Sequence, residues 1–148
     1  MQMEGSAMPD ADYGAYQGAD PYFDLVRSAL GDRVDGDHFF DIVSDSIEYE
    51  VRYDFPGWPR LLHNRTDLMA QFKGYVDGMD LTSADNLIVH ESGDGRVVII
   101  EYDVHGTVRA TGARYDNRFC SIIELEGRKI ARWRDYMDSL AAWNALTP

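Results

Sequence analysis

The chain of 148 residues is 45% hydrophobic and 27% charged, which is the length and composition of one globular domain. Its 14 Lys and Arg residues against 26 Asp and Glu residues give a formal net charge of −12. Because so negative a surface repels phosphate groups, we expect neither nucleic acid nor a membrane as a partner. The apolar runs are too short to cross a bilayer. The single cysteine, Cys120, permits no intramolecular disulfide and no zinc site built from thiolates.

The N-terminal part of the chain begins without a periodic pattern. Residues 1–19 are rich in Gly, Ala, Asp and Met, and we expect a flexible leader there, followed by a single domain over 20–148. Since this stretch lacks a signal-peptide pattern, we expect a cytoplasmic protein. A helical pattern then runs from Pro21 to Gly31, and a second, shorter one covers residues 37–43.

The rest of the chain is rich in strand patterns. Alternation predicts a half-buried strand over residues 46–53, and a loop with two prolines around Trp58 follows it. Thr66 is a candidate helix cap, with apolar residues at helical spacing as far as Gly78. Further strand patterns and a closing amphipathic turn cover residues 83–90, 96–109, 113–125, 129–137 and 140–146. Helices followed by an antiparallel meander predict an α+β fold.

The turns between the closing strands predict which side chains share a face. A two-residue turn at Thr111-Gly112 places Asp103 opposite Cys120, and one at 126–127 or 127–128 places Asp135 opposite Arg118 or Cys120. Choosing between these last two turns shifts the register by two residues, which preserves the face. One face of the sheet is then expected to hold Glu101, Asp103, His105, Arg118, Cys120, Ile122, Trp133 and Asp135.

Asp135 is the strongest candidate for acid–base chemistry. Trp133 and Met137 flank it on its own strand face and exclude water, and an apolar setting raises the pKa of a carboxylate toward neutrality. If Arg118 points to the same place, it keeps a neighbouring carboxylate charged. The histidines lack the spacing of a zinc site, and we expect no metal and no cofactor.

Ordinary structural roles stay open for several of these residues. Charged residues that alternate along a strand, such as Glu101 and Asp103, are typical of a solvated sheet face. Cys120 has no base at a fixed spacing, which also fits an inert buried thiol. Trp58 fits either core packing or a cover over a pocket.

Two stretches, residues 98–106 and 117–138, carry a family resemblance, together with the order of the elements. The second contains RWRDYMD, and both resemble the closing strands of the SnoaL-like group of the nuclear-transport-factor-like superfamily, especially phenazine-biosynthesis A/B proteins and limonene epoxide hydrolase. The resemblance implies a conical, curved antiparallel sheet wrapped around N-terminal helices and enclosing a deep apolar pocket. It also implies a homodimer built sheet against sheet. Candidates for that apolar, non-pocket face are Ile100, Tyr102, Val104, Phe119 and Ile123.

The same resemblance implies roles for individual residues. Asp135 falls where both relatives place a catalytic carboxylate, and Tyr49 is similar to the water-orienting tyrosine of the hydrolase. Asp103 matches the aspartate of the hydrolase's arginine-x-aspartate motif, but Glu101 occupies the arginine position. The hydrolase triad is therefore incomplete unless Arg118 supplies the charge.

These observations predict a small-molecule enzyme of isomerase or cyclase type that uses general acid–base catalysis on a hydrophobic substrate. Asp135 is expected to be the principal acid or base, with Asp103 as its partner, Tyr49 as a hydrogen-bond donor and Arg118 as an orienting charge. Two alternatives stay open: epoxide hydrolysis by two carboxylates, and a non-catalytic domain that binds a ligand or assembles with other chains. The residues expected to contact the substrate are Trp133, Glu101, Trp58, Cys120 and Met137.

Overall fold

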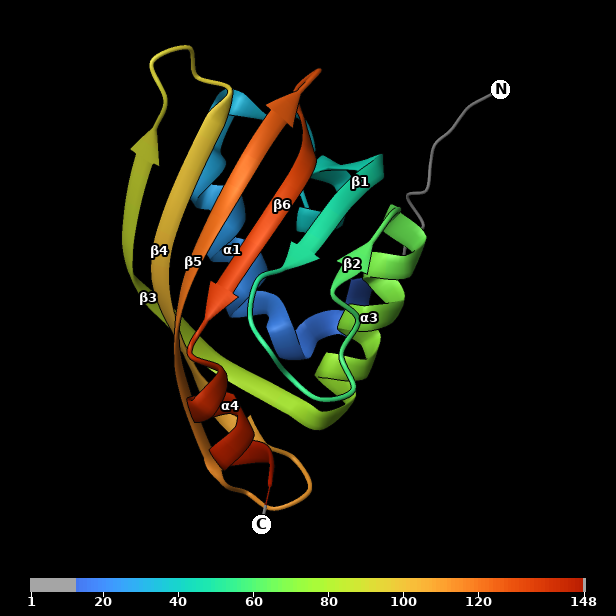
Figure 1. Ribbon diagram of the computed structural model, residues 1–148, viewed down its shortest axis with the longest axis vertical. Helices are drawn as coiled ribbons and strands as arrows, with labels where there is room; N and C mark the ends of the chain where they lie inside the picture. Colours follow the sequence, from blue (N-terminus) through green and yellow to red (C-terminus); the bar gives the residue numbers. More distant parts are fainter. Residues whose placement is uncertain (1–12, 148) are drawn as a thin grey trace.

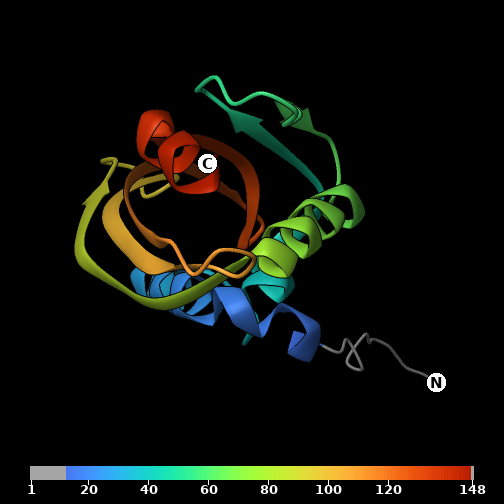
Figure 2. The ribbon, with the colours of Figure 1, turned by 90° about the horizontal axis from the view of Figure 1, so that it is seen from below.

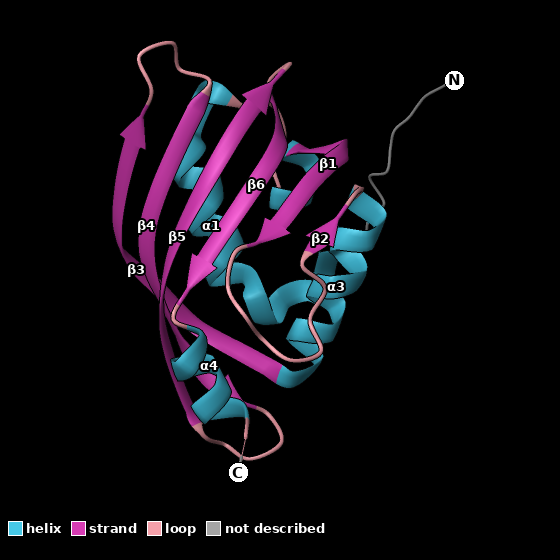
Figure 3. Cartoon of the chain, in the orientation of Figure 1, coloured by secondary structure: helices cyan, strands magenta, loops and turns pink. Residues whose placement is uncertain are grey.

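The computed structural model describes residues 13–147 of the chain. Helices come first and long strands afterwards, as Figures 1 and 3 show, so the predicted α+β class is confirmed. The elements are η2 (Tyr13–Ala19), α1 (Asp20–Leu30), η3 (Gly31–Arg33), α2 (Phe39–Ile42), β1 (Val43–Val51), β2 (Leu61–Leu62), α3 (Arg65–Gly78), β3 (Met79–Glu91), β4 (Val97–Val108), β5 (Arg114–Glu126), β6 (Lys129–Met137) and α4 (Ser139–Leu146).

The strands form one curved sheet in the order β2-β1-β6-β5-β4-β3. Neighbouring strands are antiparallel, except that β1 runs parallel to β6. Figures 1 and 2 show the sheet curving past α1, with α3 beside β1 and β2 and with α4 at the end where the chain leaves β6. This arrangement leaves the inner face of the sheet covered by helices and the outer face open.

Local signals in the sequence explain where the helices begin and end. Pro21 stands in the first turn of α1, and Gly31 ends this helix with a φ of 57°, which favours glycine. Helix α3 begins earlier than predicted, because the side chain of Asn64, rather than Thr66, accepts the backbone N–H of Asp67 at 2.8 Å.

Aromatic rings form the core beneath the sheet. The ring centroid of Phe23 lies 5.2 Å from that of Phe39 and 5.3 Å from that of Phe72. Trp133 of β6 meets Phe39 edge to face at 5.8 Å and is fully buried. The core therefore joins α1, α2, α3 and the centre of the sheet.

The prediction of a flexible leader over residues 1–19 is wrong for residues 13–19, which form η2. The Tyr13 hydroxyl donates to Asp41 Oδ1 at 2.7 Å, and its ring stacks on that of His38 at 4.2 Å. Ala19 is completely buried. Aromatic contacts at irregular spacing hold this segment, and a search for periodicity does not detect them. The part of the prediction for residues 1–12 lies outside the described residues.

The register of the closing strands differs from the predicted one in two places. Residues 109–112 form a longer loop between β4 and β5 than the predicted two-residue turn. Asp103 therefore pairs with Arg118, whereas the predicted partner was Cys120, two residues further along β5. Between β5 and β6 the predicted two-residue turn is present at Gly127-Arg128, with φ values of 58° and 62°. A shift of two residues keeps the faces, so neither turn changes which side chains face inward.

A β-bulge between β5 and β6 does change the faces. Leu125 pairs with Ile130, but Glu124 pairs with Arg132, so that Ala131 is one extra residue in β6. Beyond the bulge Asp135 therefore pairs with Ser121. A shift of one residue turns every later side chain to the other face. The prediction that Trp133 and Asp135 share a face with the charged residues of β4 and β5 is consequently wrong.

Candidate functional site

A pocket lies between the inner face of the sheet, α3, α4 and the loop from β1 to β2. It holds about 810 Å³ of space between atoms, with its opening to solvent included. Phenol rings and apolar side chains make up most of its wall, and its tyrosines are Tyr22, Tyr49, Tyr53, Tyr75 and Tyr115. Within residues 13–147, Asp135 is the only carboxylate that lines it.

Asp135 is held in place by donors from two strands. It is 3% exposed, and its Oδ1 accepts hydrogen bonds from Ser121 Oγ at 2.6 Å and from the Trp133 indole N–H at 2.9 Å. Tyr49 on β1 lies near this carboxylate and senses its charge. Tyr49 pairs with Trp133 across the parallel strands, and their rings stack at 5.8 Å. Backbone pairing and ring stacking thus fix the carboxylate and its donors.

The surroundings of Asp135 and Tyr49 shift the pKa of both side chains. Burial raises the pKa of Asp135 to about 6, although the bonds from Ser121 and Trp133 act in the opposite direction. Burial, followed by the nearby Asp135 charge, raises the pKa of Tyr49 well above its usual range. Near neutral pH, Asp135 therefore has both protonation states within reach, whereas Tyr49 keeps its proton and acts as a donor.

Sequence reasoning missed a group of hydroxyls around this carboxylate. The Tyr102 hydroxyl lies 2.9 Å from Ser121 Oγ, and both side chains are buried. Near the open end, the Asn117 amide donates to the Tyr115 hydroxyl at 2.8 Å, and Tyr75 interacts with the same hydroxyl. The sequence did contain a signal for Ser121, which is a lone small polar residue in an apolar stretch of β5. A register predicted without the β-bulge, however, places Ser121 and Asp135 on opposite faces of the sheet.

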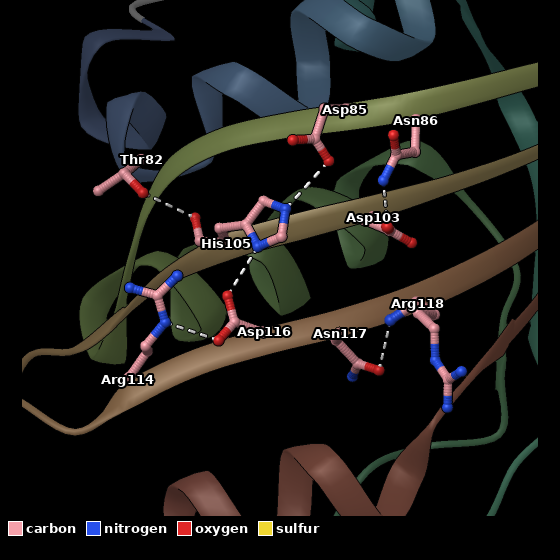
Figure 4. A network of polar contacts seen from close by, with 9 residues as sticks. All are labelled: Thr82, Asp85, Asn86, Asp103, His105, Arg114, Asp116, Asn117 and Arg118. Carbon is pink, nitrogen blue, oxygen red and sulfur yellow. Dashed lines mark hydrogen bonds and ion pairs between the residues drawn. The ribbon is translucent and has the colours of Figure 1, made fainter.

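The other predicted catalytic residues lie outside the pocket. Figure 4 shows the network on the outer face around Asp103, where Asn86 donates to the Asp103 carboxylate at 2.7 Å. The side chain of Arg118 is 79% exposed and forms an ion pair with Asp138 at 3.3 Å. His105 is held between Asp85 and Asp116, at 3.0 and 2.7 Å (Figure 4). These groups cannot reach a molecule bound beside Asp135, because the sheet itself separates them.

The predicted substrate contacts divide in the same way. Trp58 and Met137 line the pocket. Trp133 does not line it, but its indole N–H donates a hydrogen bond to Asp135, which does. Glu101 instead pairs with His90 at 2.7 Å on the outer face. Cys120 is on that face too, and burial, followed by Glu101 and Asp135, raises the pKa of its thiol.

The residues expected on the apolar, non-pocket face are also on the other side of the sheet. Val104 and Phe119 line the pocket, and the remaining three are buried in the core: Ile100, Tyr102 and Ile123. Across the described part of the chain, no group of three or more His, Cys, Asp or Glu side chains is arranged to hold a metal ion. In the same residues no helix is long and apolar enough to cross a membrane.

Fold and site together define a class of protein: an α+β domain whose curved, unclosed sheet holds one buried carboxylate in an aromatic pocket. The SnoaL-like domain matches residues 22–133, and the chain belongs to this family. It is similar to protein YesE of Bacillus subtilis strain 168, with 28% identity over 106 residues, or 72% of each chain.

Solved structures show the same fold. A candidate isomerase from Bacillus subtilis superposes with a TM-score of 0.70 at 24% identity, covering 88% of this chain and 91% of that one. A phenazine biosynthesis-related protein from Pseudomonas aeruginosa gives 0.65 at 19% identity, covering 95% and 94%. A candidate polyketide cyclase from Pseudomonas putida gives 0.66 at 16% identity, covering 90% and 94%.

Proposed function

We propose that this protein is an enzyme of isomerase or cyclase type that moves a proton on a hydrophobic small molecule, with Asp135 as the general base and acid. The observation that carries the proposal is the burial of Asp135, 3% exposed, as the only carboxylate among the described residues that line an apolar pocket. This burial raises the pKa of Asp135 to about 6. A base is most effective when its pKa lies near the working pH. The neighbours named as isomerase and polyketide cyclase support this general type.

The chemistry of the wall indicates the first step. Asp135 removes a proton from a carbon next to a carbonyl group, and the electron pair moves toward the carbonyl oxygen. Tyr49, which keeps its proton, donates a hydrogen bond to the negative charge that develops there. Asp135 then returns the proton at another position of the same molecule, which completes an isomerisation.

The charge of the wall indicates the class of substrate. In the portion that the structure describes, no Lys, Arg or His side chain lines the pocket, and the net charge of the chain is −12. An anionic substrate therefore meets repulsion from Asp135 with no compensating cation. Ring faces and apolar side chains suit a flat or polycyclic uncharged molecule with few polar groups. We therefore propose uncharged, polycyclic carbonyl compounds as substrates.

Epoxide hydrolysis by two carboxylates has less support. That mechanism needs a second carboxylate to protonate the oxirane oxygen, and the predicted partner, Asp103, lies on the outer face. Arg118, the candidate left open to supply the charge of the missing arginine, is 79% exposed and pairs with Asp138 instead.

Exchange of carbon-bound hydrogen for deuterium tests the proposal. Polycyclic ketones are incubated with the protein in heavy water, and NMR follows the label at the carbon next to the carbonyl group. We expect exchange to rise with pH through about 6 and to fall by about 10²- to 10⁴-fold in Asp135→Asn.

Asp103→Asn is the matched control, since it removes a carboxylate from the other face of the sheet, and it should exchange at the wild-type rate. Equal exchange in Asp135→Asn and the wild type would overturn the proposal. Tight binding of the ketones without any exchange would favour a non-catalytic ligand-binding domain.

A further inference from the structure

We infer that Tyr115 is a specificity residue of the pocket, and that its hydroxyl donates a hydrogen bond to a second carbonyl oxygen of the substrate, away from the carbon at which Asp135 acts. The inference rests on the proposed function, because it names a further feature of the substrate class. It concerns ligand affinity rather than rate, so it can fail while the role of Asp135 stands.

The side chain of Asn117 holds the Tyr115 hydroxyl in place, and both residues lie on β5. Asn117 Oδ1 accepts the backbone N–H of Arg118 at 2.7 Å, which fixes the orientation of the amide. Asn117 Nδ2 donates to the Tyr115 hydroxyl oxygen at 2.8 Å and to Met137 Sδ at 3.4 Å. Asn117 is 3% exposed and Tyr115 is 2% exposed, so water competes little for these bonds. The position of the hydroxyl is therefore set by the wall itself.

The bond from Asn117 uses the oxygen of the Tyr115 hydroxyl and leaves its hydrogen available. A tyrosine hydroxyl has one hydrogen to donate, and in this bond its oxygen is the acceptor. Tyr75 on α3 also influences the pKa of Tyr115, but within residues 13–147 no hydrogen bond accepts the Tyr115 hydrogen. Burial raises the pKa of Tyr115 to about 12, so the hydroxyl keeps this hydrogen at neutral pH. Because Tyr115 lines the pocket, a bound molecule can supply the acceptor.

This arrangement distinguishes Tyr115 from the other tyrosines of the pocket wall. Across the described part of the chain, Tyr115 is the one pocket tyrosine whose hydroxyl accepts a hydrogen bond from a neighbouring side chain. A donor that is already held in place loses little conformational freedom when a ligand binds, so more of its hydrogen bond contributes to affinity. Tyr115 is therefore the hydroxyl of the wall best suited to select among ligands.

Tyr115 and Asp135 lie at different places along the pocket. Asp135 pairs with Ser121 of β5, and the distance from position 115 to position 121 is about 20 Å of strand. Gln71 on α3 lines the same pocket, and among the residues that the structure describes its amide has no hydrogen-bond partner. A ligand that reaches from Asp135 to Tyr115 is thus elongated and carries a polar group toward each end. A carbonyl oxygen suits the second position, because Tyr115 offers it a hydrogen and no cation is needed.

Equilibrium binding of four ketones tests the inference. The ligands are a decalone with one carbonyl group, the decalindione with one in each ring, and the same pair built on the three-ring perhydroanthracene skeleton. Isothermal titration calorimetry at neutral pH gives each Kd. For at least one skeleton, we expect the preference for the dione over the monoketone to fall by about 3- to 10-fold in Tyr115→Phe, since one neutral hydrogen bond is lost. Comparing the two ligands in both proteins cancels their other differences.

Two further variants separate the hydrogen bond from a general effect on packing. In Asn117→Asp the new carboxylate accepts the Tyr115 hydrogen, so the preference for the dione should fall by a similar factor although the tyrosine is intact. This variant also decides the inference if Tyr115→Phe does not fold. Tyr136→Phe is the matched control, because residue 136 follows Asp135 in β6 with its side chain on the outer face, and it should keep the wild-type preference.

Carbon-13 NMR gives a direct readout of the Tyr115 hydroxyl. The Tyr115 Cζ signal is assigned by its absence from Tyr115→Phe, and it should shift when the dione is added but not when the monoketone is added. A preference that is unchanged in Tyr115→Phe for both skeletons, or a Tyr115 signal that the diones do not move, would overturn the inference. Neither result bears on Asp135, which the deuterium exchange of the monoketones tests. Asp135→Asn should lose this exchange and keep the preference for the dione, which separates the two proposals.

Discussion

Burial of Asp135 affects the stability of the fold as well as its chemistry. The pKa is about 6 in the folded chain, and an exposed aspartate in the unfolded chain titrates at about 3.9. Because the folded value is the higher one, the folded state prefers the protonated group. The resulting stabilisation is complete below about pH 4 and is lost as the pH rises through about 6.

Asp135→Asn should remove this pH dependence. A difference of about two pKa units corresponds to about 3 kcal/mol, so the wild type should lose about that much free energy of unfolding relative to the variant between about pH 4 and pH 8. The asparagine Oδ1 can still accept from Ser121 and Trp133. Urea unfolding at a series of pH values measures the difference. Parallel stability curves for the two proteins would contradict the raised pKa.

At the scale of single residues, the sequence was sufficient to place Asp135 in an apolar setting but not to identify its hydrogen-bond partners. Trp133 and Met137 flank it at alternate positions of one strand, and this spacing survives any register. Ser121 and Tyr102 are on other strands, so their identity as neighbours depends on the register between strands. The residues chosen in their place, Asp103 and Arg118, follow from a register without the bulge.

At the scale of elements, one inserted residue in β6 decides which side chains enter the pocket. The spacing of apolar residues indicates the extra residue. Ile130 and Trp133 are three positions apart, and both are buried. Residues three apart in a regular strand point to opposite faces, so two large apolar residues at this spacing indicate a bulge between them. Turn chemistry predicted the hairpin, but it says nothing about interruptions further along the ladder.

A pair of glycine substitutions tests how closely the strands and helices are packed. A Cβ at Gly106 in β4 would collide with the Asp80 carbonyl oxygen and would lie 2.9 Å from Leu81 Cα, both backbone atoms of β3. Gly106→Ala should therefore lower the free energy of unfolding by about 1–3 kcal/mol.

Gly74 in α3 is the matched position, because a Cβ there meets nothing within 4 Å. Gly74→Ala should raise the free energy of unfolding by about 0.5–1 kcal/mol, since alanine favours the helix. Chemical unfolding of both variants gives the two values. A Gly106→Ala variant that is as stable as the wild type, or more stable, would show that close approach between β3 and β4 is not the reason for glycine at position 106.

At the scale of the whole molecule, the two faces of the sheet have opposite characters. The inner face holds the aromatic core and the pocket, whereas ion pairs such as Arg132 with Glu48, at 3.0 Å, cover the outer face. The sequence predicted the fold class because it depends on the order of elements, which hydrophobic periodicity shows directly, and it predicted the family from the resemblance that residues 98–106 and 117–138 carry. It could not assign the faces, since each assignment depends on the parity of every loop and bulge.

The outer face also carries a small apolar patch. Ile99 and Ile122 pair directly across β4 and β5 on this face, and both are only half-buried in the single chain. Cys120 lies beside Ile122 on the same face, and ion pairs surround the three residues. An apolar centre with a charged rim is typical of an interface between proteins. We propose that two copies pair through this patch rather than through the apolar side chains first expected, which fill the core.

Sedimentation equilibrium measures the association. The chain of 16.8 kDa should sediment with twice that mass, and Ile122→Lys should give the monomer mass, because a buried ammonium group in the centre of the interface has no partner. Leu140→Lys is the matched control, since Leu140 is 65% exposed on α4, away from this patch, and the variant should remain a dimer. A wild-type chain that stays monomeric would overturn the homodimer. An Ile122→Lys variant that still dimerises would place the interface elsewhere.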